Sequence, residues 1–225
     1  MEINHLADKL GLKFNDLNLL KEALTHRSYL NEVKEKISSN ERLEFLGDAV
    51  LSFIISSWLF KKFPEYPEGK LTNLRSNLVK TSSLAKIAQK LKIGDYLLLS
   101  KGEKESQGQK NPTLLANTME AIIGAIFLDQ GTETVKNFIK THFNPLLEEI
   151  IKTGRLKDYK SLLQEKIQAQ EKPAPIYKTI KEEGPEHDKI FTVNVIVENK
   201  ILATGKGKSK QKAEQQAAKK ALQSL

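Results

Sequence analysis

The sequence predicts two domains: an all-α domain, followed by a small α+β domain with the element order α-β-β-β-α. Apolar residues recur at helical spacing through roughly the first 150 positions. A short polar segment with a glycine, residues 152–157, follows them and is typical of a linker. Beyond it, a stretch of alternating apolar and polar residues lies between two helical patterns. We therefore expect domains at residues 1–151 and 158–225, with 152–157 as the linker.

The first domain is expected to contain a long amphipathic helix that begins after Asn40, a plausible N-cap, and ends before Pro64. The segment at residues 101–110 is polar and contains glycine, so we interpret it as a mobile loop. Asn111 and Pro112 are expected to be the N-cap and first residue of a buried helix. The other helices of this domain are predicted at residues 71–80, 82–91, 113–128 and 132–149.

The second domain is expected to open with a helix at residues 159–168 and to close with an alanine-rich helix at 209–225. Between them, Phe191, Val193, Val195 and Val197 alternate with Thr192, Asn194 and Ile196, which predicts a strand with one buried face. Its neighbours are predicted at residues 176–181 and 201–205. The face of the last helix that packs on the sheet is expected to carry Ala213, Ala217, Ala221 and Leu225.

Composition narrows the classes of function. The formal net charge is +8 and the isoelectric point is about 9.4, which favours a polyanionic partner. From residue 157 onward there are 14 lysines against 9 acidic residues, and Lys206, Lys208, Lys210 and Lys212 follow one another with no acid between them. Without cysteine, thiol catalysis, disulfides and thiolate zinc sites are excluded. No apolar run reaches the roughly 18 residues of a membrane span, and no signal peptide is present, so we expect a cytoplasmic protein with no membrane partner.

Acidic residues gather at the start of the long helix. Glu41, Glu44 and Asp48 are spaced three and four apart, which places them within about 60° on one helix face. One interpretation is a solvated acidic face that pairs with Arg42 or a nearby lysine. The other is a cluster whose mutual repulsion is relieved by a bound cation. The spacing alone leaves both open.

The buried helix at residues 113–128 carries further oxygen ligands. Asn117 and Glu120 lie three apart on one face of an otherwise apolar segment, and a buried carboxylate needs a partner. A basic side chain is one candidate, and a metal ion shared with the first acid cluster is the other. Oxygen ligands without cysteine or nearby histidine favour Mg²⁺, with Mn²⁺ as a substitute. In a basic protein this indicates metal-assisted hydrolysis of phosphodiesters.

Several segments carry a family resemblance. Residues 41–50, ERLEFLGDAV, resemble the full signature of ribonuclease III, and residues 117–126, NTMEAIIGAI, resemble the second acidic motif of that family. Residues 24–28, LTHRS, and residues 71–75, LTNLR, are also similar to family segments. The resemblance covers essentially the whole chain, and it implies an all-α catalytic domain.

The resemblance also implies roles for individual residues. It places Glu44, Asn117 and Glu120 at metal-ligand positions, and Asp48 and Glu120 where the essential catalytic acids lie. Three further residues are implied to act near a dimer contact: Glu41 and Glu68 as supporting acids, and Phe45 as an aromatic residue that packs across the dimer.

One position departs from the family pattern. The family usually has aspartate where this chain has Asn117, and a neutral amide oxygen binds a divalent cation more weakly than a carboxylate. A catalytically weak or inactive binder of double-stranded RNA is therefore the alternative. Because the other acids are retained, we expect an active enzyme.

Residues 157–225 resemble a double-stranded-RNA-binding domain. Such domains recognise the shape of A-form helices through phosphates and 2′-hydroxyls. The resemblance implies RNA contacts in separate regions: the first helix, the turn between the first two strands, and the start of the last helix, where amide groups also favour phosphate. The implied contact residues are Gln164, Gln168, Pro185, His187, Lys208, Lys210 and Lys212.

The resemblance therefore implies a homodimeric, Mg²⁺-dependent endoribonuclease that cleaves double-stranded RNA through a metal-activated water and uses no small-molecule cofactor. It would leave 5′-phosphates and short 3′ overhangs on ribosomal RNA precursors and structured messenger RNAs. The rivals are a non-catalytic RNA chaperone or ribosome-associated binder of the same fold, and a phosphohydrolase of small phosphate esters. The second domain argues against the phosphohydrolase, because a small substrate needs no duplex clamp.

Overall fold

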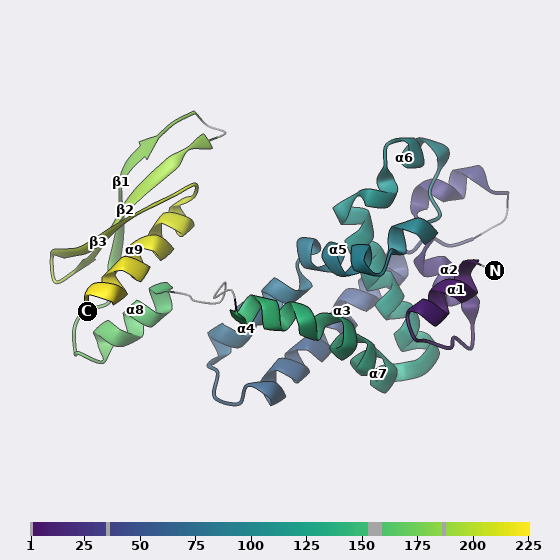
Figure 1. The fold of residues 1–225 in the computed structure, drawn as a ribbon, viewed down its shortest axis with the longest axis horizontal. Coiled ribbons are helices and arrows are strands. Elements are labelled where there is room, and N and C mark those ends of the chain that lie inside the picture. The colour runs from purple at the N-terminus through teal and green to yellow at the C-terminus, as the bar shows by residue number, and fades with distance from the viewer. Residues whose placement is uncertain (1, 35–36, 153–158, 186–187) are drawn as a thin grey trace. The chain divides into compact units, whose positions relative to one another are not determined.

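The computed structural model describes residues 2–34, 37–152, 159–185 and 188–225 (Figure 1). The chain divides into two compact units, residues 1–153 and 154–225. The first is helical, and the second has the order α-β-β-β-α, so the predicted fold class is confirmed.

The first unit contains the α-helices α1 to α7 and short 3₁₀ turns η1 to η3. Their bounds are α1 Glu2–Lys9, α2 Leu17–Ala23, η1 Arg27–Glu32, α3 Glu41–Lys62, α4 Glu68–Val79, α5 Thr81–Lys90, η2 Ile93–Tyr96, α6 Lys101–Glu105, η3 Gly108–Lys110 and α7 Pro112–Lys152. The predicted helices at 113–128 and 132–149 are both parts of α7, with Gly131 at φ +75° as a non-helical residue between them. Residue 152, predicted to start the linker, ends this helix. Residues 153–157 lie outside the described part of the chain.

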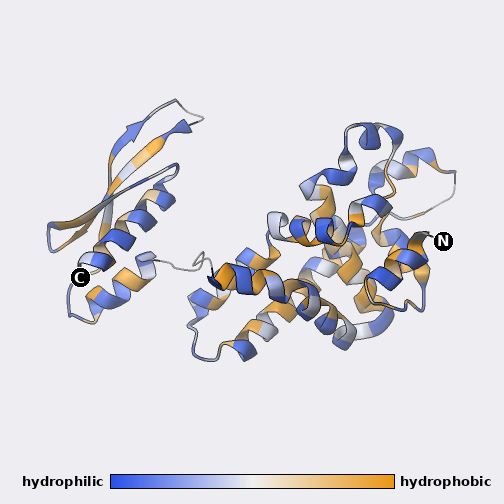
Figure 2. Cartoon of the chain, viewed as in Figure 1, coloured by the Kyte–Doolittle hydropathy of each residue, from blue (hydrophilic) through white to orange (hydrophobic). Residues whose placement is uncertain are grey.

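The core of the first unit lies between α3, α7 and the helices around them. Apolar residues are frequent along these helices, as the orange segments in Figure 2 show, and many of them are buried. In α7, every residue from 121 to 126 is buried. Within the described residues, α3 is the one helix long and apolar enough to cross a membrane by length and composition, a test that a core helix also passes. Its buried residues pack in the domain core, as expected of such a helix.

One local prediction in this unit is wrong, and another is confirmed only in part. The segment at 101–110 is ordered as α6 and η3, because the Ser100 side chain accepts a hydrogen bond from the N–H of Glu103, and the N–H of Lys101 donates to Glu32. Asn40 is the N-cap residue of α3, as predicted, and its carbonyl accepts from the N–H of Glu44, but its side chain makes no capping hydrogen bond. Its buried side-chain amide donates to the carbonyl of Ala23 at 3.4 Å instead. Asn111, in contrast, accepts from the N–H of Thr113, as predicted.

The second unit is a three-stranded antiparallel sheet with two helices. Its elements are α8 Tyr159–Gln168, β1 Ile176–Glu183, β2 Ile190–Val197, β3 Lys200–Gly207 and α9 Lys210–Ser224, with strand order β1-β2-β3. α9 packs against β2, β3 and α8. The core consists of Leu163, Ile167, Val195, Val197, Ala217, Ala218 and Ala221.

Two details of the second unit differ from expectation. Leu225 is 43% exposed and follows the end of α9 at Ser224, so it is not part of the buried face of that helix. On the central strand, Thr192 and Asn194 are buried as well as the valines on the opposite face. Strands pair with β2 along both edges, and Thr204 of β3 donates a hydrogen bond to the side-chain oxygen of Asn194 at 2.7 Å.

Candidate active site and nucleic-acid interface

A cavity of about 660 Å³ opens where the first turns of α3 and α7 meet. It contains all the acidic and amide side chains predicted from the two helices, so the structure brings together residues that are about 70 positions apart in sequence. The lining residues are His26, Arg27, Asn40, Glu41, Glu44, Phe45, Asp48, Thr113, Leu114, Asn117 and Glu120.

Two glycines allow α3 and α7 to approach this closely. A Cβ atom on Gly47 would lie 1.8 Å from the carbonyl oxygen of Glu120, and one on Gly124 would lie 2.4 Å from that of Leu43. The helix backbones are therefore in direct contact at this crossing. Because Gly47 immediately precedes Asp48, the crossing places Asp48 beside the turn of α7 that carries Glu120.

Crowding of acids perturbs their ionisation. Burial, with smaller contributions from Asp48 and Glu44, raises the pKa of Glu120 to about 7. Burial also raises the pKa of Glu44, and Glu41 and Asp48 act in the same direction, while a hydrogen bond from Asn117 opposes them. At neutral pH the cavity thus holds carboxylates that ionise at a cost in free energy, which a bound cation would offset.

The side chains present fit a hard divalent cation. Glu120 has no ion pair or hydrogen bond through its carboxylate in the described residues, and the nearby Arg27 pairs with Glu41, at 3.7 Å. No three histidine or acidic side chains of the described chain are close enough to hold one metal ion. A cation bound between Glu44 and Glu120 would therefore need the amide oxygen of Asn117 as its third protein ligand.

Four residues that line the cavity carry no role predicted from the sequence: His26, Arg27, Thr113 and Leu114. The N–H of His26 donates to the carbonyl of Leu98, and its Nδ1 lies 2.9 Å from the hydroxyl of Ser28, so both backbone and ring are held. The available signal was the family-like segment LTHRS, which contains His26 and Arg27.

The structure does not bring Glu68 to the cavity. Glu68 begins α4 and lines a separate apolar hollow of about 580 Å³, where it accepts a hydrogen bond from the hydroxyl of Thr72. Phe45 lines the acid cavity and is 82% exposed. Phe53 and Phe60, further along α3, are exposed and line the apolar hollow.

In the second unit, those residues predicted to contact RNA that the structure describes are exposed. Gln164 and Gln168 lie one turn apart on α8, and Pro185 follows β1. His187 lies outside the described residues. Lys208, Lys210 and Lys212 surround the N-terminus of α9, where the N–H of Lys212 donates to the side chain of Ser209.

Family models match both units. Residues 16–147 match the model described as ribonuclease-III-like, and residues 159–225 match the double-stranded RNA binding motif. The matched regions contain all of the candidate site residues. The acid cavity lies within the first region, and the lysines of α9 lie within the second.

Relatives and solved structures agree with these matches. The chain is 43% identical to Ribonuclease 3 of Borreliella afzelii over all of its length and 91% of the relative, and 48% identical to that of Syntrophobacter fumaroxidans over 97% and 92%. The crystal structure of the ribonuclease III nuclease domain from Campylobacter jejuni covers 63% of this chain and 93% of its own, with 43% identity and a TM-score of 0.58. A second structure of that domain, 44% identical, covers 63% and 99% with the same TM-score, and concerns flexibility in a region involved in dimer formation. A nuclease model over more than half of the chain, and such identities across nearly all of it, show that the chain belongs to the ribonuclease III family.

Proposed function

We propose that this endoribonuclease of double-stranded RNA works as a homodimer, with Mg²⁺ held by Glu44, Asn117 and Glu120, and leaves 5′-phosphates and short 3′ overhangs. One observation carries the proposal: a partly buried carboxylate, Glu120, lies among other acids and has no cationic partner in the described residues. Such an arrangement is costly in a stable protein unless a cation binds there. Ribonuclease III enzymes generally depend on a metal ion.

Each residue has a role that follows from its position. Glu44 and Glu120 supply negative charge from opposite helices, and Asn117, which donates to Glu44, keeps its amide oxygen available as a ligand. Asp48 adds a carboxylate beside Glu120 and can accept a proton from the attacking water. Bound Mg²⁺ supplies Lewis-acid activation of the phosphodiester and of water. Arg27 holds Glu41 at the rim.

Exposed aromatic residues support the homodimer. Phe45, Phe53 and Phe60 are 82%, 64% and 71% exposed on α3, and a monomer rarely leaves such apolar surface in water. The apolar hollow beside Phe53 and Phe60 has room for an aromatic ring, and we assign it to Phe45 of the partner subunit. Since Phe45 also lines the acid cavity, this contact would bring the partner's cavity next to Glu68.

The dimer can be tested by sedimentation of two single variants. Phe45→Ala should shift the chain towards the monomer, because it removes the ring that fills the hollow. Leu128→Ala is the control, since Leu128 is also exposed, on α7, but lines neither cavity. Equal sedimentation of both variants would contradict the assignment.

The second unit supplies the specificity for duplexes. Exposed glutamines on α8 and lysines at the start of α9 suit the 2′-hydroxyls and phosphates of A-form RNA. We propose ribosomal RNA precursors and structured messenger RNAs in the cytoplasm as the substrates. The alternative of an inactive binder rests on Asn117 alone, and no comparison favours it.

The decisive experiment is incubation of the full chain with an end-labelled RNA duplex, with and without Mg²⁺, beside the single strand of the same sequence. We expect cleavage of the duplex alone, and only with the metal. Glu120→Gln should abolish cleavage while duplex binding is retained, because it removes a ligand charge far in sequence from the lysines of α9. Equal loss of binding and cleavage would contradict this division of labour.

A further inference from the structure

Two lysines of the α9 start already have carboxylate partners inside the second unit. Lys208 Nζ lies 2.7 Å from Asp188 Oδ1, and Lys210 Nζ lies 2.9 Å from Glu182 Oε1. Glu182 belongs to β1, and Asp188 lies in the segment between β1 and β2. The carboxylates of Glu182 and Asp188 therefore lie at hydrogen-bonding positions of the lysine ammonium groups that RNA phosphates would otherwise take.

These ion pairs are not needed to hold α9 on the sheet. A Cβ atom on Gly205 would lie 2.2 Å from the carbonyl oxygen of Ala213, and one on Gly207 would lie 2.6 Å from the N–H nitrogen of the same residue. The backbones of β3 and α9 are thus in contact at the place where the lysines begin. All four paired side chains are substantially exposed, and exposed ion pairs contribute little to stability.

The pairs nevertheless orient the lysine side chains, since each ammonium group lies within hydrogen-bond distance of one carboxylate oxygen. Free lysine side chains sample many rotamers, and this freedom is lost on binding. Here Lys210 is held between Glu182 and the ring of Phe191, with Nζ 5.7 Å from the ring centroid. Lys208 is held by Asp188, which lies between β1 and β2. The two ammonium groups are therefore presented in a set arrangement.

Lysines in a set arrangement affect the binding of rigid and of flexible polyanions differently. An A-form duplex offers phosphates at regular positions, so prealigned lysines favour it. A flexible single strand adapts to lysines in any arrangement and gains nothing from prealignment. The carboxylates also reduce the positive charge that all polyanions feel. Removing them strengthens binding of every polyanion, but only the RNA duplex loses the benefit of alignment.

We propose that Glu182 and Asp188 are positioning residues that make the lysines of α9 selective for duplex RNA over other polyanions. The inference rests on the RNA-binding function proposed above. It adds two acidic residues to an RNA-binding surface that is otherwise described by its lysine and glutamine side chains.

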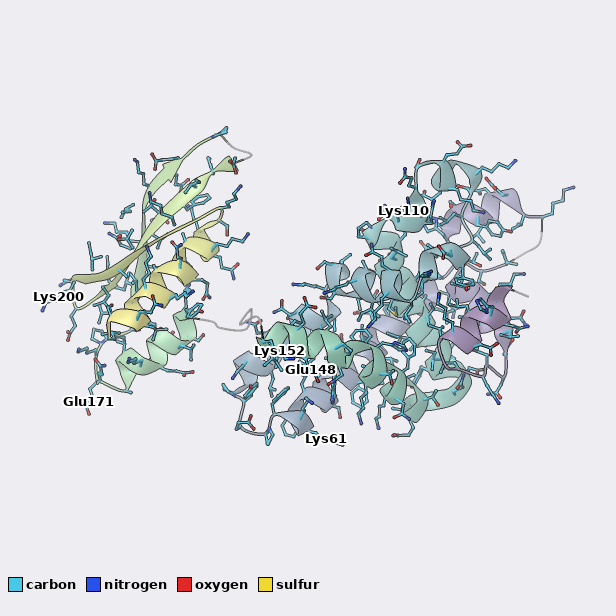
Figure 3. All side chains as sticks on the ribbon, viewed as in Figure 1. Lys61, Lys110, Glu148, Lys152, Glu171 and Lys200 are labelled. Carbon is cyan, nitrogen blue, oxygen red and sulfur yellow. The ribbon has the colours of Figure 1, made fainter. Side chains whose placement is uncertain are left out.

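The test compares two double variants of the full chain with the same change in net charge. Glu182→Gln/Asp188→Asn removes both partners. The control, Glu171→Gln/Glu198→Gln, removes two exposed acids for which the described residues show no ion pair. Glu171 and Lys200, labelled in Figure 3, both lie towards the end of the unit opposite to the C-terminal end of β1. Dissociation constants for an RNA duplex, its single strand and a DNA duplex are measured in EDTA at several salt concentrations.

In Glu182→Gln/Asp188→Asn, binding of single strands and of DNA should tighten about fivefold at low salt, and binding of the RNA duplex should tighten less. The ratio of duplex to single-strand affinity should then fall about threefold relative to the control, and Asp188→Glu should preserve it. An unchanged or higher ratio would overturn the inference, with thermal melting used to confirm that each variant is folded. If the unmodified chain itself shows no preference for duplex RNA, the RNA-binding function fails instead.

Discussion

Replacing Glu120 by glutamine should stabilise the metal-free protein at alkaline pH, although it should destroy activity. A carboxyl whose pKa rises from 4.5 to about 7 on folding resists ionisation in the native state. At about 1.4 kcal/mol per pH unit, the full cost of ionisation is up to about 3.4 kcal/mol. Because Glu120 is only partly buried, solvent screening should reduce this to roughly 1–2 kcal/mol.

The sign of the pH dependence follows from the raised pKa. Between pH 4.5 and about 7 the native state binds more protons at Glu120 than the unfolded state does, so the free energy of unfolding falls as the pH rises through this range. Above this pH range, the free energy of unfolding falls no further on account of Glu120. Glu120→Gln cannot ionise and should lack this contribution. The variant should therefore be about 1–2 kcal/mol more stable than the unmodified chain at pH 8 and nearly equal to it at pH 4.5.

The measurement is urea unfolding in EDTA, followed by fluorescence. Trp58 is the single tryptophan of the chain and lies on α3, so its emission reports on the nuclease unit. Mg²⁺ at pH 8 should stabilise the unmodified chain and not the variant. Glu133→Gln is a matched control on α7. A hydrogen bond from Lys136 lowers the pKa of Glu133, so removal of this carboxylate should not stabilise the protein. Equal stability of Glu120→Gln and the unmodified chain at pH 8 would refute the reasoning.

Three other predictions follow from the described geometry. Asn117→Asp should lower the Mg²⁺ concentration for half-maximal cleavage, since a third ligand charge strengthens the attraction of the site for the cation. Cleavage by this variant alone, and not by the unmodified chain, would show that the natural site is disabled. Truncation after Ile151 should weaken duplex binding most at physiological salt, yet leave some RNA cleavage at low salt and high Mg²⁺. Undiminished affinity of the truncated chain in a binding assay would contradict the role of the second unit. Gly124→Ala should cost about 2–4 kcal/mol in urea unfolding, whereas Gly69→Ala, with no atom within 4 Å of its new Cβ, should be close to neutral; equal costs would show that the helix crossing tolerates a side chain.

Much of the nuclease unit could be predicted because its information is local. The spacing of Glu41, Glu44 and Asp48 places them on one face of a helix whatever else the chain does, and the apolar pattern around Asn117 and Glu120 shows that their helix is buried. That both sets line one cavity depends on the crossing of α3 and α7. The spacing of residues within either helix does not predict that crossing, although the glycine in each motif indicates that another backbone segment approaches closely there.

Other features could not be predicted, because they depend on contacts distant in sequence. The order of residues 101–110 depends partly on Glu32, whose carboxylate binds the N–H of Lys101. Glu68 lines the apolar hollow, apart from the other acids, and only the proposed second subunit would bring another acid cavity next to it. The pairing of Lys208 with Asp188 joins residues 20 positions apart, across a sheet end whose register the sequence does not specify.

The backbone contact at Gly47 and Gly124 has a consequence for mutational tolerance. Since main-chain atoms set the separation of α3 and α7 there, the spacing of the acids above the contact does not depend on the shape of any particular core side chain. Exchanges among leucine, isoleucine and valine elsewhere in the core can then change stability by a modest amount without moving the carboxylates. The two glycines confine the geometric demands of catalysis to a few positions and leave the rest of the helical core free to vary.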